Sequence, residues 1–384
     1  MELCKVKNSR FLLFCALIAS VVVITTLSAY IILVKDSSAR EYKTNKDNAS
    51  VEQLLGQSIK TADTGQRYIV YDCSKAKKGA CGGWSDRITG ILTTLVISLL
   101  TKRRFLIKHE KPCLLENFLI PADHFDWRFN KSILLDRTSS YQDLSAREST
   151  NLRKYMSGSL DINTYFKHDV NFVRMNWDFT EEFRKRRNIE VEIPWMTKLR
   201  YTDMYKQLFK FLFTPSPLFA KELNKLKSQR RRPKLACAHL RLGDNPTLPG
   251  DDYRKSLNLD LVWNYLNTID QKKYDLFVAS DAHHVKEMAR QRYSVNIIDS
   301  PGNITHIDQN NGNDPGVGFL KQLTDFYTLT TCDVLLLSSS GFGMFAAYLR
   351  DTDTDLYCLR SEDIIPCTRN ALNEIYPGQV LAPD

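Results

Sequence analysis

The sequence predicts an α/β protein with two Rossmann-like domains, preceded by a single transmembrane helix. The main observation is a regular alternation after residue 233, where short apolar runs alternate with longer segments of helical periodicity. Strands spaced in this way form parallel sheets with helices on both faces. A strand, a glycine turn, a helix and a second strand follow the same order near residue 68. With 384 residues, of which 43% are hydrophobic, the chain can bury two cores.

The amino end contains an apolar segment and then a polar one. Residues 11–34 carry no charge, and a segment of this length spans a bilayer and exceeds the apolar region of a cleavable signal peptide. A signal peptide stays an alternative, because Ser28 and Ala29 resemble a cleavage site. We expect a cytosolic tail at 1–10, a signal anchor at 11–34 and a flexible stem at 35–66.

Glycosylation sequons and cysteines indicate that the rest of the chain enters the secretory pathway. Acceptor sequons begin at Asn48, Asn130 and Asn303. Seven cysteines also follow the apolar segment, and because seven is odd we expect one free thiol. We choose Cys237, which lies in an apolar run, whereas Cys358 and Cys367 are close enough in sequence to pair. These features predict a luminal body on a single-pass anchor.

The formal net charge of +9 would suit a nucleic-acid partner, but a secretory lumen makes that partner unlikely for this chain. Two basic clusters, 184–187 and 230–232, are typical of solvated faces or linkers. The alternative is a surface that meets anionic glycans or the phosphates of a nucleotide. The sequence leaves open whether the body forms a homodimer.

The first domain should span residues 67–225. Its expected elements are a strand at 68–71, a helix at 88–100, strands at 105–107, 133–135 and 172–175, and a helix at 202–213 that Pro215 and Pro217 stop.

The second domain should span residues 226–384, and the basic segment 225–233 should form the crossing into it. Its expected strands lie at 234–241, 275–279, 295–299, 333–338 and 355–359, and its helices at 260–270, 283–293, 318–331 and 341–350.

The most informative segment is 236–244, in which an apolar strand ends in a turn that carries His239, Arg241, Gly243 and Asp244. Open α/β sheets bind ligands at the carboxyl ends of their strands. A guanidinium at such a place can hold a diphosphate through paired hydrogen bonds. The alternative is an arginine–aspartate pair that only fixes the turn.

This motif resembles the first motif of the fucosyltransferase superfamily, which includes α1,2-, α1,6- and protein O-fucosyltransferases. Segments 276–281 and 325–341 resemble the second and third motifs, and the likeness covers about residues 230–361. A weaker likeness extends it to 82–87. The resemblance implies a GT-B-like fold and an inverting, metal-independent transfer of fucose from GDP-fucose to a glycan hydroxyl at the Golgi membrane. The alternatives are a transferase of the same fold that uses another nucleotide sugar, and a catalytically inactive glycan-binding protein.

The resemblance also assigns roles to single residues. Arg241, helped by His239, would stabilise the departing diphosphate, a task for which many transferases use a metal. Asp351-Thr-Asp353-Thr-Asp355 would be the candidate metal motif, but we expect it to be a solvent-facing turn. We expect no cofactor.

The serines at 338–340 and the aspartates at 325 and 281 each have two possible roles. The serines at 338–340 with two glycines exceed what a helix N-cap needs, so they favour phosphate binding over capping alone. The resemblance to α1,6 enzymes implies that Asp325 pairs with the edge of guanine, and the alternative is an exposed helix charge. Asp281 would hold a ribose hydroxyl, or cap a helix that begins near His283.

The resemblance implies that the base that takes the proton of the acceptor hydroxyl is a carboxylate about ten residues after the motif histidine, which favours Asp251 or Asp252, with Asp86 next. Asp86 has the alternative role of N-cap for the helix that follows it. The expected donor-binding residues are His239, Arg241, Gly243, Asp244, Asp281, Asp325, Ser338, Ser339, Ser340, Gly341, Phe342, Gly83 and Arg87.

Overall fold

The computed structural model describes residues 66–379, except 75–80, 124, 146–149, 249–256 and 310–313, and a short segment at 53 and 55–59. The predicted tail, anchor and most of the stem lie outside the described residues. Among the described residues, every helix is too short or too polar to span a bilayer. Leu55 and Ile59 are buried, and Ile59 lies beside Phe105 and Phe125. The folded body therefore begins inside the predicted stem, which corrects that boundary.

The first sheet is entirely parallel, with the order β2-β1-β5-β4. Helix α2 crosses from β1 to β2, and almost all of its side chains are buried because it is apolar on nearly every face. The opening strand, helix and strand predicted from the sequence are confirmed. The bounds are β1 (Tyr68–Cys73), α2 (Trp84–Leu100), β2 (Arg104–His109), β4 (Ser139–Asp143) and β5 (Val170–Arg174).

The strand predicted at 133–135 is wrong. Residues Lys131–Leu134 form a 3-10 turn (η2), because the side chain of Asn130 accepts a hydrogen bond from the backbone N–H of Ser132 and starts the turn. Leu135, which the prediction placed in a sheet, is 69% exposed.

The second sheet has the order β12-β11-β10-β7-β8-β9, and only β12 is antiparallel to its neighbour. The predicted strands and helices of this region are confirmed to within a few residues. The bounds are β7 (Lys234–Leu240), α10 (Leu259–Asn267), β8 (Tyr274–Ser280), α11 (His283–Arg292), β9 (Ile297–Ile298), α12 (Pro315–Thr330), β10 (Val334–Leu337), α13 (Gly341–Leu349), β11 (Leu356–Leu359) and β12 (Ile364–Pro366).

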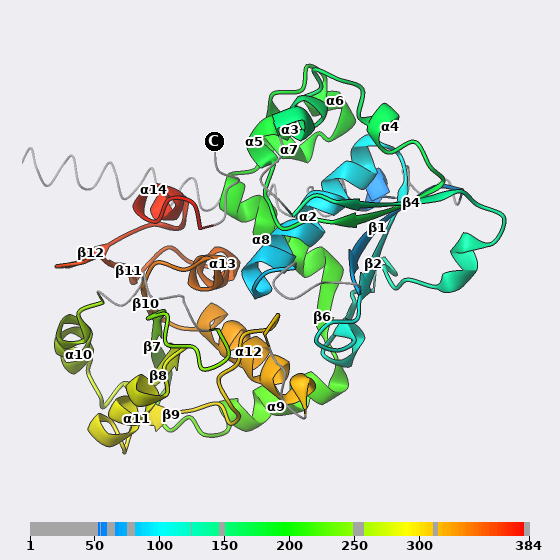
Figure 1. The fold of residues 1–384 in the computed structure, drawn as a ribbon. Helices are drawn as coiled ribbons and strands as arrows, with labels where there is room; N and C mark the ends of the chain where they lie inside the picture. The colour runs from blue at the N-terminus through cyan, green and yellow to red at the C-terminus, as the bar shows by residue number, and fades with distance from the viewer. Residues whose placement is uncertain are drawn as a thin grey trace, which may run out of the picture. The chain divides into compact units, whose positions relative to one another are not determined.

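The order of the second sheet creates a crevice. One face of the central strands packs on α10 and α11 in a single apolar core. Helices α12 and α13 contact each other and lie beside the same sheet (Figure 1). Strands β7 and β10 are neighbours, but the chain leaves β7 toward β8 and leaves β10 toward β11. The loops after β7 and β10 therefore diverge, and ligands of open α/β sheets bind at such a switch point.

A helical connection joins the two sheets. Helix α8 (Tyr201–Leu212) confirms the predicted helix, and β6 (Phe213–Pro215) follows it and pairs antiparallel with β3 (Leu119–Pro121). Pro217 does not stop a helix but starts α9 (Pro217–Lys227), so the crossing is limited to residues 228–233.

The remaining short helices surround these sheets. They are η1 (Leu115–Asn117), α3 (Thr150–Met156), α4 (Ile162–Tyr165), α5 (Thr180–Arg184), α6 (Ile189–Glu192), α7 (Trp195–Lys198), η4 (Arg369–Ala371) and α14 (Leu372–Ile375).

The disulfide pattern corrects one prediction. Cys237 is not a free thiol, because it is bonded to Cys332, which follows α12 and reaches the same face of β7. Cys73 is bonded to Cys81, and the predicted bond between Cys358 and Cys367 is confirmed. Among the cysteines of the described residues, Cys113 is the free one.

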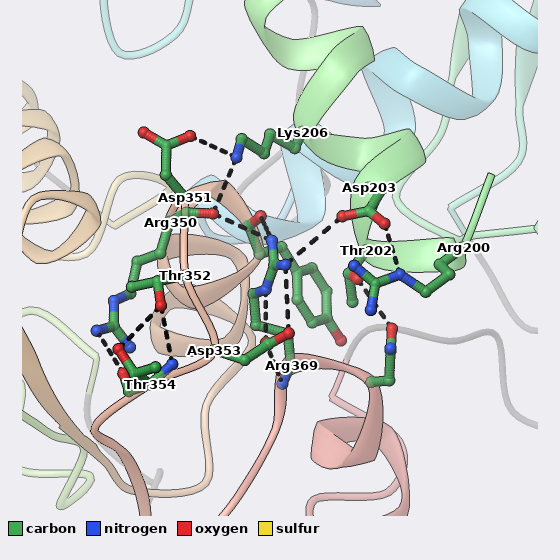
Figure 2. A network of polar contacts seen from close by, with 12 residues as sticks. Arg200, Thr202, Asp203, Lys206, Arg350, Asp351, Thr352, Asp353, Thr354 and Arg369 are labelled. Carbon is green, nitrogen blue, oxygen red and sulfur yellow. Dashed lines mark hydrogen bonds and ion pairs between the residues drawn. The ribbon is translucent and has the colours of Figure 1, made fainter. Parts of the chain in front are cut away.

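The acidic motif at 351–355 forms a polar network with α8, which Figure 2 shows. Asp351 lies 2.5 Å from the Lys206 ammonium. Asp353 accepts a hydrogen bond of 2.7 Å from Nε of Arg369, whose side chain is buried. Burial favours a higher pKa for Asp353, but the hydrogen bonds and charge of Arg369 outweigh it and hold this pKa below its usual value. Asp351 and Asp353 thus pair with basic side chains, and no cluster suited to a metal occurs in the described residues.

Replacing Arg369 with methionine should lower the free energy of unfolding by about 2–4 kcal/mol, because the Asp353 carboxylate and the buried carbonyl of Tyr348 lose the hydrogen bonds that Arg369 donates. The control is Lys210→Met, because Lys210 is exposed and lies 3.4 Å from Asp351; we expect a loss below about 1 kcal/mol. Urea denaturation measures both. Equal losses would show that the buried ion pair of Arg369 contributes no more to stability than the exposed pair of Lys210.

Non-reducing peptide mapping tests the corrected disulfide pattern. After denaturation and alkylation, Cys237 and Cys332 should appear in one linked peptide, while Cys113 should carry the alkyl group. An alkylated Cys237 would instead support the free thiol that the sequence predicted at this position.

Candidate functional site

A cavity of about 330 Å³ lies at the crevice of the second sheet and is also lined by residues from helix α2 and from the loop after β5 of the first sheet. The start of α2 and residues 176–177 after β5 contribute one wall. The loops after β7, β8 and β10, residues 303–307 and helix α12 contribute the other.

The cavity brings together many of the predicted site residues. Those that line it are Gly83, Asp86, His239, Arg241, Asp281, Asp325, Ser340, Gly341 and Phe342. Gly243, Asp244, Ser338, Ser339 and Arg87 do not line it. Asp251 and Asp252 lie outside the described residues, as does Asn48.

Arg241 lies immediately after β7 and faces the cavity. Its Nη1 atom is 3.1 Å from Oδ2 of Asp281, and 17% of the side chain is exposed. Its backbone N–H donates a hydrogen bond of 2.8 Å to the hydroxyl of Ser338, which follows β10. Ser338 therefore joins the two loops of the crevice, and its hydroxyl does not cap a helix. Asp244 points away, with one oxygen 4.0 Å from Nδ1 of His284.

Asp281 braces the turn that carries Arg241. Its two carboxylate oxygens accept hydrogen bonds from the backbone N–H groups of Leu242, at 2.7 Å, and Gly243, at 2.8 Å. Gly243 has a φ of +83°, a conformation that glycine adopts without strain. The suggested capping role is wrong, because Ala282 is the N-cap of α11 and no side chain caps that helix. The arginine–aspartate pair exists, and it leaves Arg241 at the cavity wall.

Two helix N-termini meet at the cavity. A β-carbon on Gly341 would lie 2.9 Å from the hydroxyl oxygen of Ser85, so the first turns of α13 and α2 are in contact. A β-carbon on Gly343 would lie 2.6 Å from Nδ1 of His239, so this glycine lets the imidazole approach α13. Ser340 is the N-cap of α13 but makes no side-chain hydrogen bond to that helix. Helix N-termini attract anions through their free N–H groups and dipoles.

Asp325 is buried, so its reading as an exposed helix charge is wrong. Its carboxylate accepts hydrogen bonds from the hydroxyl of Ser300 and the ammonium of Lys321. Burial favours a higher pKa for Asp325, but the charges of Lys321 and Lys286 outweigh it and hold this pKa below its usual value. An ionised carboxylate thus faces the cavity from α12.

Asp86 caps α2 from inside the helix. The helix begins at Trp84 with Gly83 as N-cap, and the carboxylate of Asp86 accepts a 2.6 Å hydrogen bond from the backbone N–H of Gly83. Asp86 is therefore not the N-cap residue of the prediction, although it does stabilise the same helix end.

Arg87 lies in the interior and not at the cavity, which corrects the prediction that it contacts the nucleotide-sugar donor. Its side chain is fully buried and donates to Asp308, to the carbonyls of Gly82 and Lys111, and to Nε2 of His109 at 2.8 Å. A guanidinium only donates, so Nε2 of His109 is the acceptor. Burial, and then the charge of Arg87, lower the pKa of His109 to about 3.

Sequence reasoning missed His306, which lines the cavity close to Gly83. Its Nδ1 accepts a hydrogen bond of 3.3 Å from the backbone N–H of Asp308, so the neutral ring carries its proton on Nε2. Its own backbone N–H donates to the hydroxyl of Thr247 at 2.7 Å. His306 lies between β9 and α12, in a segment without periodicity, so nothing in the sequence pattern marked it.

The predicted sequon at Asn303 lies at the same cavity, and Asn303 itself is exposed. A glycan there would stand beside the cavity wall. The sequon residue Asn130 is exposed on the η2 turn, away from the cavity.

Comparisons with known proteins connect this geometry to one fold. No protein-family model and no curated protein matches the chain. Among solved structures, a mutant of Arabidopsis thaliana FUT1 in complex with GDP is similar with a TM-score of 0.53 at 14% identity, over 79% of this chain and 73% of that chain.

Two structures of NodZ are similar as well. The α-1,6-fucosyltransferase NodZ co-crystallised with GDP has a TM-score of 0.50 at 12% identity, over 78% of this chain and 98% of that chain. Fucosyltransferase NodZ from Bradyrhizobium has a TM-score of 0.50 at 10% identity, over 79% and 99%. At these identities the likeness concerns the fold, which is a fucosyltransferase-like α/β fold with parallel sheets.

The buried His109 predicts a pH dependence of stability. Unfolded histidine has a pKa of about 6.5, so below that pH the unfolded chain binds a proton that folded His109 does not bind. Stability should therefore fall between pH 6.5 and pH 3, by about 1.4 kcal/mol per pH unit from this group. In His109→Gln, urea denaturation at several pH values should give a shallower decline. The control is His283→Gln on the exposed start of α11, and a decline as steep in His109→Gln as in the control would refute this assignment.

Proposed function

We propose that this protein is a glycosyltransferase that transfers fucose from GDP-fucose to a glycan hydroxyl with inversion. The observation that carries the proposal is Arg241, which faces a cavity at the switch point of the second sheet beside the starts of α2 and α13. Structural neighbours that were crystallised with GDP support a guanosine nucleotide as the donor.

The second sheet would hold the donor. Arg241 would stabilise the charge that develops on the departing diphosphate, because its fork fits two phosphate oxygens. The N–H groups at the starts of α13 and α2 supply further positive potential without a metal. Asp325 would accept hydrogen bonds from the edge of guanine, at the α12 side of the cavity.

The acceptor would enter from the side of α2. Inversion requires the hydroxyl to attack the sugar from the face opposite the diphosphate, while a carboxylate takes its proton. Asp86 lies on that wall and is a candidate for this base, although it already accepts the Gly83 N–H. Asp251 and Asp252 remain the other candidates. If none of them acts, the protein would be an inactive glycan-binding member of the same fold.

The compartment is also part of the proposal. We infer a type II protein of the Golgi membrane, anchored through residues 11–34, with the body in the lumen. Three disulfides in the described residues support an oxidising compartment for that body.

Binding of nucleotides and transfer of labelled fucose test the proposal together. Calorimetric titration should show binding of GDP in preference to UDP and CMP, and a glycan array should accept fucose from GDP-fucose. A preference for UDP would favour another nucleotide sugar. GDP binding without hydrolysis or transfer would favour the inactive protein.

Arg241→Ala should weaken GDP binding by about 30-fold or more and abolish transfer, because the diphosphate loses its charged partner. Arg241→Lys should also lose GDP binding and transfer, since an ammonium cannot make the paired hydrogen bonds of a guanidinium. The control is Arg128→Lys, because Arg128 is exposed and its ion pair is with Asp126, two residues before it. Calorimetry and a transfer assay measure the effects, and full activity in Arg241→Ala would refute the role.

A further inference from the structure

Ser300, Lys321 and Asp325 form a closed triangle of polar contacts beside the cavity. The Lys321 ammonium lies 2.8 Å from the Ser300 hydroxyl and 2.9 Å from Oδ2 of Asp325, and the same hydroxyl donates to Oδ1. The exposed fractions are 2% for Ser300, 4% for Lys321 and 7% for Asp325. Three polar side chains are thus buried together in one fixed arrangement.

The triangle keeps a carboxylate charged where burial would neutralise it. Lys321 precedes Asp325 by one helical turn on α12, so the two side chains share a face. Lys286 of α11 adds a second positive charge, and its own ammonium lies 2.5 Å from Asp299. Burial lowers the pKa of Lys321, an effect that the charge of Asp325 partly offsets. Arg290 pairs with Asp299 as well, so three positive charges meet two carboxylates in this cluster.

The triangle also fixes the plane of the carboxylate. A terminal carboxylate rotates over a broad range when nothing holds it. Here one oxygen is bound by Ser300 and the other by Lys321. A carboxylate has about four acceptor positions, so two contacts leave acceptor capacity on both oxygens. Both Lys321 and Asp325 line the cavity, so a ligand bound there can donate hydrogen bonds to the carboxylate oxygens of Asp325.

We propose that Ser300 and Lys321 are positioning residues that orient Asp325 to select a nucleobase with two adjacent N–H donors. This inference rests on the guanosine donor of the proposed function and adds the residues that make the site select it. Guanine presents an N1–H beside an N2 amine, which fit two oxygens of one carboxylate. Adenine and cytosine place an acceptor beside their amine, and uracil has a single N–H between two acceptors. Each would leave an oxygen of Asp325 facing another acceptor, which is unfavourable.

Inosine diphosphate isolates this recognition, because it keeps N1–H and the diphosphate but lacks the N2 amine. Calorimetry on the full-length protein should show that GDP binds at least about tenfold more tightly than inosine diphosphate, since inosine diphosphate lacks one hydrogen bond to the charged carboxylate. In Ser300→Ala, the preference should fall to about threefold or less, while inosine diphosphate binding stays within about threefold of the native protein.

Ser98→Ala is the matched control, because Ser98 is a buried serine of α2 whose hydroxyl donates to the Leu95 carbonyl of its own helix. It should keep the full preference for GDP. Lys321→Met should lose the preference as Ser300→Ala does, and thermal unfolding of each variant verifies that it is folded. If Lys321→Met does not fold, Ser300→Ala decides alone.

The outcomes separate this inference from the function on which it rests. If the native protein binds neither diphosphate, the proposed function fails. If the native protein prefers GDP and Ser300→Ala keeps that preference, the positioning role is refuted while the proposed function stands. Equal binding of both diphosphates by the native protein also refutes it, because the N2 amine is then not read.

Discussion

The carboxylate of Asp281 holds the turn through which Arg241 reaches the cavity, and the arrangement of the site depends on this brace. Two backbone N–H groups and one guanidinium converge on the same buried side chain. Because Asp281 follows β8 while Arg241 follows β7, the brace fixes two neighbouring strand ends against each other. The hydroxyl of Ser338 joins the turn to β10 in the same way. Three adjacent strands thereby present one rigid edge to the cavity.

Much of the second sheet could be predicted from the sequence. Its strands are short apolar runs bounded by polar turns, and the helices between them are long enough to show their period. The helices of residues 110–200 could not be predicted in this way, because they have three to seven residues and are too short to show a period. Cys237 was misread for a related reason. An apolar strand indicates burial, but it does not reveal that Cys332 arrives at the same face from a distant part of the chain.

The site could be predicted where its residues end strands, and not where they depend on tertiary contacts. Arg241 and the serines at 338–340 follow apolar runs, so their position at the crevice was readable. Arg87 was misplaced, because a charge next to a glycine turn gives no sign that Asp308 will meet it in the interior. His306 and Lys321 were missed, since one lies in an irregular loop and the other resembles an ordinary helix lysine.

The bond between Cys237 and Cys332 joins strand β7 to the segment that follows helix α12, and both of these elements lead to the cavity. Cys237 lies four residues before Arg241, and Cys332 lies seven residues after Asp325. A covalent tie therefore joins the strand that carries the guanidinium to the helix that carries the carboxylate. The spacing between these two charges is set during folding, before any ligand arrives, so a ligand whose charges match this spacing meets a preorganised site and loses less entropy on binding.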